Sequence, residues 1–194
     1  MTGVAGPMFA RDRRAGSRFL AGLLGGELGS AVLVGLTLYV AGVALHAVGI
    51  PSSVSAGLLV LICVGLGLAD LLDRTPHSWR QVPQRLVTSL TPGMLGVTWG
   101  IDLGLYVTTQ KVSSLIWVAM AASVLLDPAS APVLLIALAL STGAGVIVAS
   151  TVPGLTQGAG GVRWSRWTQR TLRRVAGVSI LILAGLEGMQ VLLG

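Results

Sequence analysis

Residues 31–72 decide the fold class. They read AVLVGLTLYVAGVALHAV (31–48), then GIPSS (49–53), then VSAGLLVLICVGLGLADLL (54–72). A helix of about 20 apolar residues, rising 1.5 Å per residue, is long enough to cross a bilayer. Glycine and proline in the short middle segment end one helix and allow a turn before the next. We therefore interpret this stretch as two membrane-spanning helices joined by a tight turn.

The composition of the whole chain points the same way. Of the 194 residues, 53% are hydrophobic and 10% are charged, and the mean hydropathy is +0.83. Soluble domains carry about a quarter charged residues, and disordered chains are far less apolar, so both classes are excluded. A single cysteine excludes an internal disulfide and a C-x-x-C pair. We predict an all-α, polytopic bundle of transmembrane helices, with residues 1–194 forming one integral membrane domain.

Further along the chain, residues 133–152 and 175–193 form two more apolar spans. The region between 86 and 126 allows two interpretations, because Pro92 and Gly93 interrupt it and Asp102 lies inside it. Either 86–108 and 112–126 are separate spans, giving six in all, or there are five full spans. In the second case a helix broken near residues 100–112 follows a re-entrant or interfacial segment at 86–99.

The distribution of arginine favours five spans. Net charge is +6, from 13 Lys and Arg against 7 Asp and Glu, and the arginines lie in tracts at 11–18, 74–85 and 163–174. Short cytoplasmic loops carry an excess of such residues. Five spans place all three tracts in the cytoplasm, together with an N-terminal tail at 1–17, whereas six spans place the last tract outside. Five spans also put Lys111 at membrane depth, at a cost of about 2.5–3.5 kcal/mol.

The distribution of arginine also predicts which kind of molecule the basic tracts contact. Because the basic tracts lie between apolar runs, we expect them to face a lipid bilayer rather than nucleic acid. The prediction is a multi-pass protein of the cytoplasmic membrane with its N-terminus inside the cell, and the Arg-, Ala-, Gly- and Leu-rich composition is typical of a bacterium.

Two parts of the sequence follow the same order of features. Glu27-Leu-Gly precedes an apolar span, Pro51, small residues and a second span; Asp102-Leu-Gly precedes an apolar run, Pro128, small residues and another span. A basic tract containing tryptophan follows each copy. We interpret residues 27–85 and 102–174 as an internal repeat, which in carriers often forms a binding site at the repeat interface. The alternative is chance alignment of residues that are common in membrane helices.

Ionisable residues inside apolar spans are the first candidates for a functional site, because burying them in a bilayer is costly. Glu27, Asp70 and Asp102 fall near the cytoplasmic ends of three spans, where they could converge as a cation or proton site. For Glu27 and Asp70 the alternative is a position at the headgroup boundary, paired with a neighbouring arginine. Asp102 lies within the spacing Gly96-xxx-Gly100-xxx-Gly104, which lets another helix approach closely.

The residues after Asp102 form the most polar stretch within any candidate span. They are Tyr106, Thr108, Thr109, Gln110 and Lys111. Such residues tolerate membrane depth where they line a cavity or satisfy one another, so we include them as candidates for binding a solute or ion. The alternative is an ordinary turn outside the membrane.

The sequence offers no set of catalytic residues. No nucleophile-elbow, H-E-x-x-H, P-loop or paired-carboxylate motif is present. Two distant histidines without a suitable carboxylate or cysteine spacing argue against a metal site, and we expect no cofactor. An enzymatic role is left open but disfavoured.

Residues 99–115, WGIDLGLYVTTQKVSSL, resemble the start of the second repeat of the DsbD/CcdA-type cytochrome c biogenesis membrane proteins, and residues 174–186, RVAGVSILILAGL, resemble their last helix. Those proteins pass electrons across the membrane through two cysteines carried on helices. Here Thr108-Thr109-Gln110 stands where that family has Thr-Pro-Cys, and thiol exchange needs a pair of cysteines. The resemblance therefore implies an inverted-repeat scaffold with a helix broken around 108–111, without the redox activity.

The sequence supports two main functional hypotheses. The first is a carrier-like membrane protein that binds or moves a small solute or ion through a site in the helix bundle. The second is a non-catalytic accessory subunit of a larger membrane complex or a homo-oligomer, because the pairs Gly22/Gly26 and Gly25/Gly29 suit helix association. A redox-inactive relative of the membrane thiol-electron carriers is a further alternative.

Overall fold

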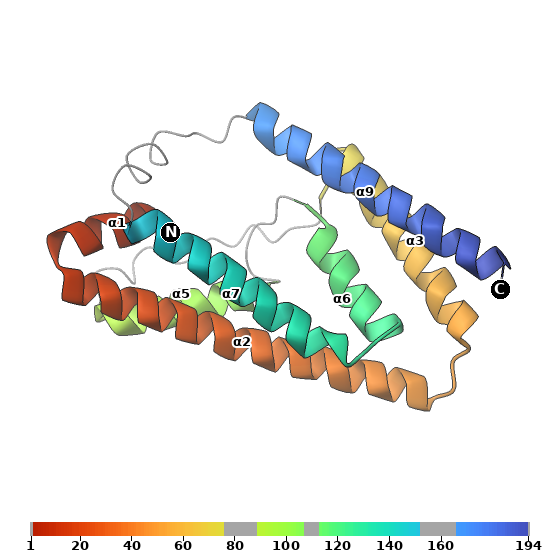
Figure 1. Ribbon diagram of the computed structural model, residues 1–194, viewed down its shortest axis with the longest axis horizontal. Coiled ribbons are helices and arrows are strands. Elements are labelled where there is room, and N and C mark those ends of the chain that lie inside the picture. Colours follow the sequence, from red (N-terminus) through yellow and green to blue (C-terminus); the bar gives the residue numbers. More distant parts are fainter. Residues whose placement is uncertain (1, 76–88, 107–112, 152–165, 194) are drawn as a thin grey trace. The chain divides into compact units, whose positions relative to one another are not determined.

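The computed structural model describes residues 2–75, 89–106, 113–151 and 166–193, and within these residues it contains helices and no strand (Figure 1). This confirms the all-α prediction. The helices are α1 (Thr2–Arg11), α2 (Arg13–Ala47), α3 (Ser52–Leu71), α5 (Pro92–Gly104), α6 (Leu115–Leu125), α7 (Ser130–Thr151) and α9 (Arg166–Leu193). In this part of the chain α2, α3 and α7 are long and apolar enough to cross a membrane, whereas α6 is apolar but shorter.

Large apolar side chains lie exposed along these helices. Leu61 on α3 is 70% exposed, Val40 on α2 is 62% exposed and Val133 on α7 is 70% exposed. A water-soluble protein rarely exposes so much contiguous apolar surface, whereas a bilayer is the solvent that such surfaces require. The exposed side chains therefore support the conclusion that this is a membrane protein.

The first long helix begins earlier than the apolar pattern predicts. We expected a first span at 31–48, starting no earlier than about residue 20, but α2 begins at Arg13. The Asp12 carboxylate accepts a hydrogen bond from the Arg14 backbone N–H over 2.8 Å, which is the usual role of a residue preceding a helix. With no proline between 13 and 47, the helix continues through the glycine-rich segment without a break.

The turn between α2 and α3 lies where the sequence predicts it. Gly49 has a φ of +78°, a backbone conformation that glycine adopts without the steric penalty of a Cβ. Pro51 then precedes the first residue of α3. A second proline, Pro128, lies in the turn between α6 and α7.

Helix α5 ends inside the range 100–112, where the sequence predicts a break in the helix. Helix α5 begins at Pro92, since proline is well suited to the first turn of a helix. It therefore runs through residue 99, where we expected one segment to end and another to begin. It ends at Gly104, and Tyr106 has a φ of +56°, which does not continue a right-handed helix. The chain is helical again from Leu115.

The chain divides into two compact units. Unit 1 consists of Met1–Val34, Trp79–Thr109 and Leu134–Arg163. Unit 2 consists of Gly35–Ser78, Gln110–Val133 and Trp164–Gly194.

In unit 1, α2 and α5 pack backbone against backbone. A Cβ on Gly96 would lie 2.9 Å from the Leu23 nitrogen, and one on Gly100 would lie 2.7 Å from the Glu27 nitrogen. Gly104 lies against Glu27 and Ser30 in the same way. Since residue numbers increase along both helices from one contact to the next, α5 runs parallel to α2. The Gly96/Gly100/Gly104 spacing thus mediates close helix packing, as predicted.

The part of α7 in unit 1 runs in the opposite direction. Tyr106 contacts Leu135, Glu27 contacts Thr142, and Val146 and Ile147 pack on a buried cluster closer to the start of α2. That cluster consists of Phe19, Leu20, Leu23, Leu95 and Trp99, and the rings of Phe19 and Trp99 meet edge to face with their centroids 5.8 Å apart. In the described part of unit 1, α2, α5 and α7 therefore surround this cluster, and Met8 and Phe9 of α1 also pack against it.

In unit 2, α3 packs along α9 (Figure 1). A Cβ on Gly67 would lie 2.9 Å from Leu181 Cγ, and one on Gly177 would lie 2.9 Å from the Gly67 oxygen. Nearer the start of α3, Leu59 shares a buried cluster with Ala184. The two helices are therefore antiparallel.

Helix α6 runs against the direction of α3 in unit 2. Its first turn is bonded to Asp70, near the end of α3, and its last residues lie close to Gly42, near the end of α2, where an added Cβ would be 3.0 Å from the Val124 oxygen.

The glycine contacts predict opposite effects for two alanine substitutions. Gly100→Ala forces a methyl group into the α2 backbone and should destabilise the protein by about 1–3 kcal/mol. Gly25→Ala on α2 meets no atom within 4 Å and should leave stability unchanged or raise it by up to about 1 kcal/mol, because alanine favours helix. Thermal unfolding in detergent compares the two, and equal melting temperatures would contradict the packing described.

Candidate functional site

Glu27 is the most deeply buried carboxylate of unit 1. It lies on α2 and is 1% exposed. The Thr142 hydroxyl on α7 donates a hydrogen bond to Glu27 Oε1. Gly143, the next residue on α7, lies close to α2, because a Cβ there would be 2.7 Å from Leu24 Cδ1 and 3.4 Å from Glu27 Oε2. A buried carboxylate of this kind has to be stabilised by neighbouring polar groups or by a bound cation or proton.

Asp102 lies on the helix packed against Glu27. Gly100 and Gly104, two residues before and after it on α5, both contact the backbone of Glu27, so the two acids are at the same level of the helix pair. Asp102 is 9% exposed. Because it is two residues from both Gly100 and Gly104, however, Asp102 lies on the face of α5 turned away from α2, so the two acids share a level of the helix pair but not a helix face.

Tyr106 lies two residues after the end of α5 and contacts α7. Its hydroxyl donates to the Leu135 carbonyl oxygen on α7 over 3.1 Å, and the side chain is 2% exposed. The positive φ of Tyr106 costs conformational energy in a residue other than glycine, so the packing around it must hold the chain in this shape. Tyr106 therefore connects the helix break to α7.

Ser30 completes the polar lining on the α2 side. Its hydroxyl donates to the Gly26 carbonyl oxygen over 2.7 Å, one turn earlier in α2, and it is 5% exposed. Because this hydrogen bond is made within the helix, the serine keeps its hydroxyl satisfied in an apolar setting. Gly104 on α5 leaves room for its Oγ.

Asp70 belongs to unit 2 and has a different environment. Its side chain is 0% exposed. It accepts hydrogen bonds from the hydroxyls of Thr75 and Ser114 and from the Ser114 backbone N–H, each over 2.7 Å. Asp70 pairs with these groups, whereas two arginines of α9 contact Asp73, Arg170 over 3.7 Å and Arg173 over 4.0 Å.

The remaining predicted site residues lie outside the described part of the chain. These are Thr108, Thr109, Gln110 and Lys111. Sequence reasoning missed Thr142, Ser114 and Thr75, the hydroxyl donors that bind the buried acids. The signal for Thr142 was present, because Ser141-Thr142-Gly143 is a polar interruption within an apolar span.

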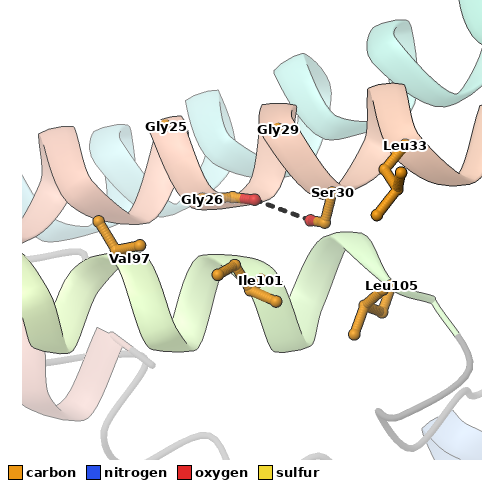
Figure 2. A pocket seen from close by; sticks show the side chains of 8 residues that line it. All are labelled: Gly25, Gly26, Gly29, Ser30, Leu33, Val97, Ile101 and Leu105. Atoms are coloured by element: carbon orange, nitrogen blue, oxygen red, sulfur yellow. Dashed lines mark hydrogen bonds between the residues drawn. The ribbon is translucent and has the colours of Figure 1, made fainter.

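An apolar groove lies between α2 and α5, next to the helix turns that carry Glu27 and Asp102 (Figure 2). It has a volume of about 460 Å³. Val97, Ile101 and Leu105 of α5 form one wall, and Gly25, Gly26, Gly29, Ser30 and Leu33 of α2 form the other. With Ser30 Oγ bonded to Gly26, this lining offers shape and apolar contact but no reactive group.

The comparisons with known proteins do not identify a relative. Neither a protein-family model, nor a curated protein, nor a solved structure matches this chain. Any functional conclusion therefore depends on the residues themselves. Among the residues that the structure describes, no group of three or more His, Cys, Asp or Glu side chains is placed to hold a metal ion.

The Tyr106 hydrogen bond can be tested on its own. Tyr106→Phe keeps the ring but removes the hydroxyl that binds Leu135, and should lower the free energy of unfolding by about 1 kcal/mol. Tyr39→Phe is the matched control, because Tyr39 on α2 is 40% exposed. Thermal unfolding in detergent should show a lower melting temperature for the first variant alone, and an equal loss in both would contradict the role given to Tyr106.

Proposed function

We propose that this chain is a carrier-like integral membrane protein that binds or moves a small solute or ion, with a binding site in unit 1. The observation that carries the proposal is the burial of two carboxylates, Glu27 and Asp102, on packed helices in a chain whose long helices expose large apolar side chains. Acidic residues inside a bilayer are expensive and are retained where they bind or relay a charge. Carboxylate and hydroxyl oxygens suit a cation or a proton.

The arrangement of helices around these acids supports the proposal. Glu27 is carried by α2, its hydroxyl partner Thr142 by α7, and Asp102 by α5, which ends two residues later at Gly104. Carriers commonly form their sites where a helix is interrupted, because the free backbone groups there can face a ligand. The predicted polar residues Thr108–Lys111 lie outside the described residues and stay a prediction from the sequence.

We propose five spans, of which one is broken near residues 100–112. The N-terminus lies in the cytoplasm of a bacterial cell. Two separate spans at 86–108 and 112–126 would run in opposite directions. They would also place the arginine tract at 163–174 outside the cell. With five spans all three arginine tracts lie on one side of the membrane, in agreement with the positive-inside rule.

A second candidate function is an accessory subunit of a membrane complex or a homo-oligomer. It is favoured by the second glycine pair of α2, Gly25 and Gly29, which lines the groove and has no neighbouring atom within 4 Å of an added Cβ. The resemblance to the DsbD/CcdA-type proteins remains a prediction about the scaffold. With Cys63 as the one cysteine, thiol exchange is not part of either proposal.

Ion flux in proteoliposomes tests the carrier proposal. Vesicles holding the protein, a trapped pH-sensitive dye and an inside-negative potential should take up protons or radioactive sodium at least tenfold faster than protein-free vesicles. Glu27→Gln and Asp102→Asn keep the side-chain size but remove the charge, and should reduce the flux to the protein-free rate.

Asp127→Asn is the control for these variants, because Asp127 lies exposed in the turn between α6 and α7. It should transport like the unmodified protein. A flux equal to that of empty vesicles, or a Glu27→Gln protein as active as the original, would remove the basis of the carrier proposal and favour the accessory-subunit alternative.

A further inference from the structure

Asp70 forms the junction of three helices at one end of unit 2. It lies in the last turn of α3 and bonds to Ser114, the residue that precedes α6. On a third side it meets α9, where an added Cβ on Gly177 would lie 3.2 Å from Asp70 Cβ. One carboxylate thus accepts three hydrogen bonds, two of them from the start of another helix.

The start of α6 depends on this carboxylate. Residues before a helix usually satisfy its first backbone N–H groups with their own side chains, but the Ser114 side chain makes no such bond and binds Asp70 instead. A negative charge near a helix N-terminus is stabilising, since the helix dipole is positive there. Helix α6 has 11 residues, too few to be stable without outside contacts.

A static junction would not need a buried charge. Apolar side chains of the same volume often hold helices together at least as well, because removing a charge from water is costly. Hydrogen bonds to a carboxylate differ in that water can replace them when the groups separate. Water is close to this end of α3, because Asp73, three residues later, pairs with Arg170, whose side chain is 65% exposed.

We propose that Asp70 is a conformational latch: its hydrogen bonds to Ser114 and Thr75 hold α6 against α3, and their joint loss releases the start of α6. The closed position is the one in this structure. The inference concerns unit 2 alone and does not depend on the carrier proposal or on the acids of unit 1.

The chain carries its own reporter of this release. Cys63, its one cysteine, lies on α3 and is 3% exposed. It belongs to the buried cluster that contains Val118 and Leu125 of α6 and Ile180 of α9. When α6 leaves α3, the Cys63 thiol becomes accessible, so its rate of modification measures how often the latch opens.

The experiment compares the rate at which a small membrane-permeant maleimide modifies Cys63 in the purified full chain and in single variants. Asp70→Asn replaces one acceptor oxygen by an amide nitrogen, and Ser114→Ala removes one hydroxyl bond while keeping the Asp70 carboxyl group. Each variant should be modified about tenfold faster than the unmodified protein or more, as expected for the loss of a hydrogen bond to a charged group, and its helix content by circular dichroism should be unchanged.

Ser123→Ala is the matched control. Ser123 also lies on α6, but its hydroxyl donates to the Ala119 carbonyl oxygen within the helix and accepts from Ser130 at the start of α7 over 3.4 Å. Neither bond reaches α3, so Cys63 should react at the original rate. If Asp70→Asn fails to fold, Ser114→Ala decides. The latch is wrong if folded Ser114→Ala shows the original rate, or if Ser123→Ala speeds the reaction equally, because the effect would then be a general loosening of α6.

Discussion

The close contact between the backbones of α2 and α5 is the constraint on which the interior of unit 1 depends. Glycines at 96, 100 and 104 allow this approach, because any larger residue there would collide with α2. In a bilayer, where apolar side chains gain little by leaving lipid, such tight packing is a main source of helix association. The contact also fixes Glu27 and Asp102 at one level of the helix pair.

Once these acids are buried, the surrounding helices have to supply polar groups. Thr142 of α7 binds Glu27, and the Tyr106 hydroxyl joins the end of α5 to α7. Unit 2 meets the same requirement differently, since Asp70 is satisfied by Thr75 and Ser114. Similar acids thus have different surroundings: Asp70 binds the residue that precedes a helix, whereas Glu27 lies beside the last turns of α5.

The sequence predicted the elements better than their partners. Apolar runs and prolines located α2, α3 and α7, because helix length and breaks are local properties. The glycine spacing around Asp102 predicted a close helix contact but could not say that α2 makes it, since that depends on the fold. The partners of the acids were missed for the same reason: Thr142 is 115 residues from Glu27, and Ser114 is 44 residues from Asp70.

The proposed five-span topology is tested most directly by the side of the membrane on which each loop lies. Single cysteines at Ser53, Ala129 and Gln157, each in a Cys63→Ala background, test it by labelling intact cells with a membrane-impermeant thiol reagent. A single broken span predicts that positions 53 and 129 react from outside and that position 157 reacts only after the membrane is opened. Labelling of 157 from outside, with 129 protected, would show two separate spans and contradict the account.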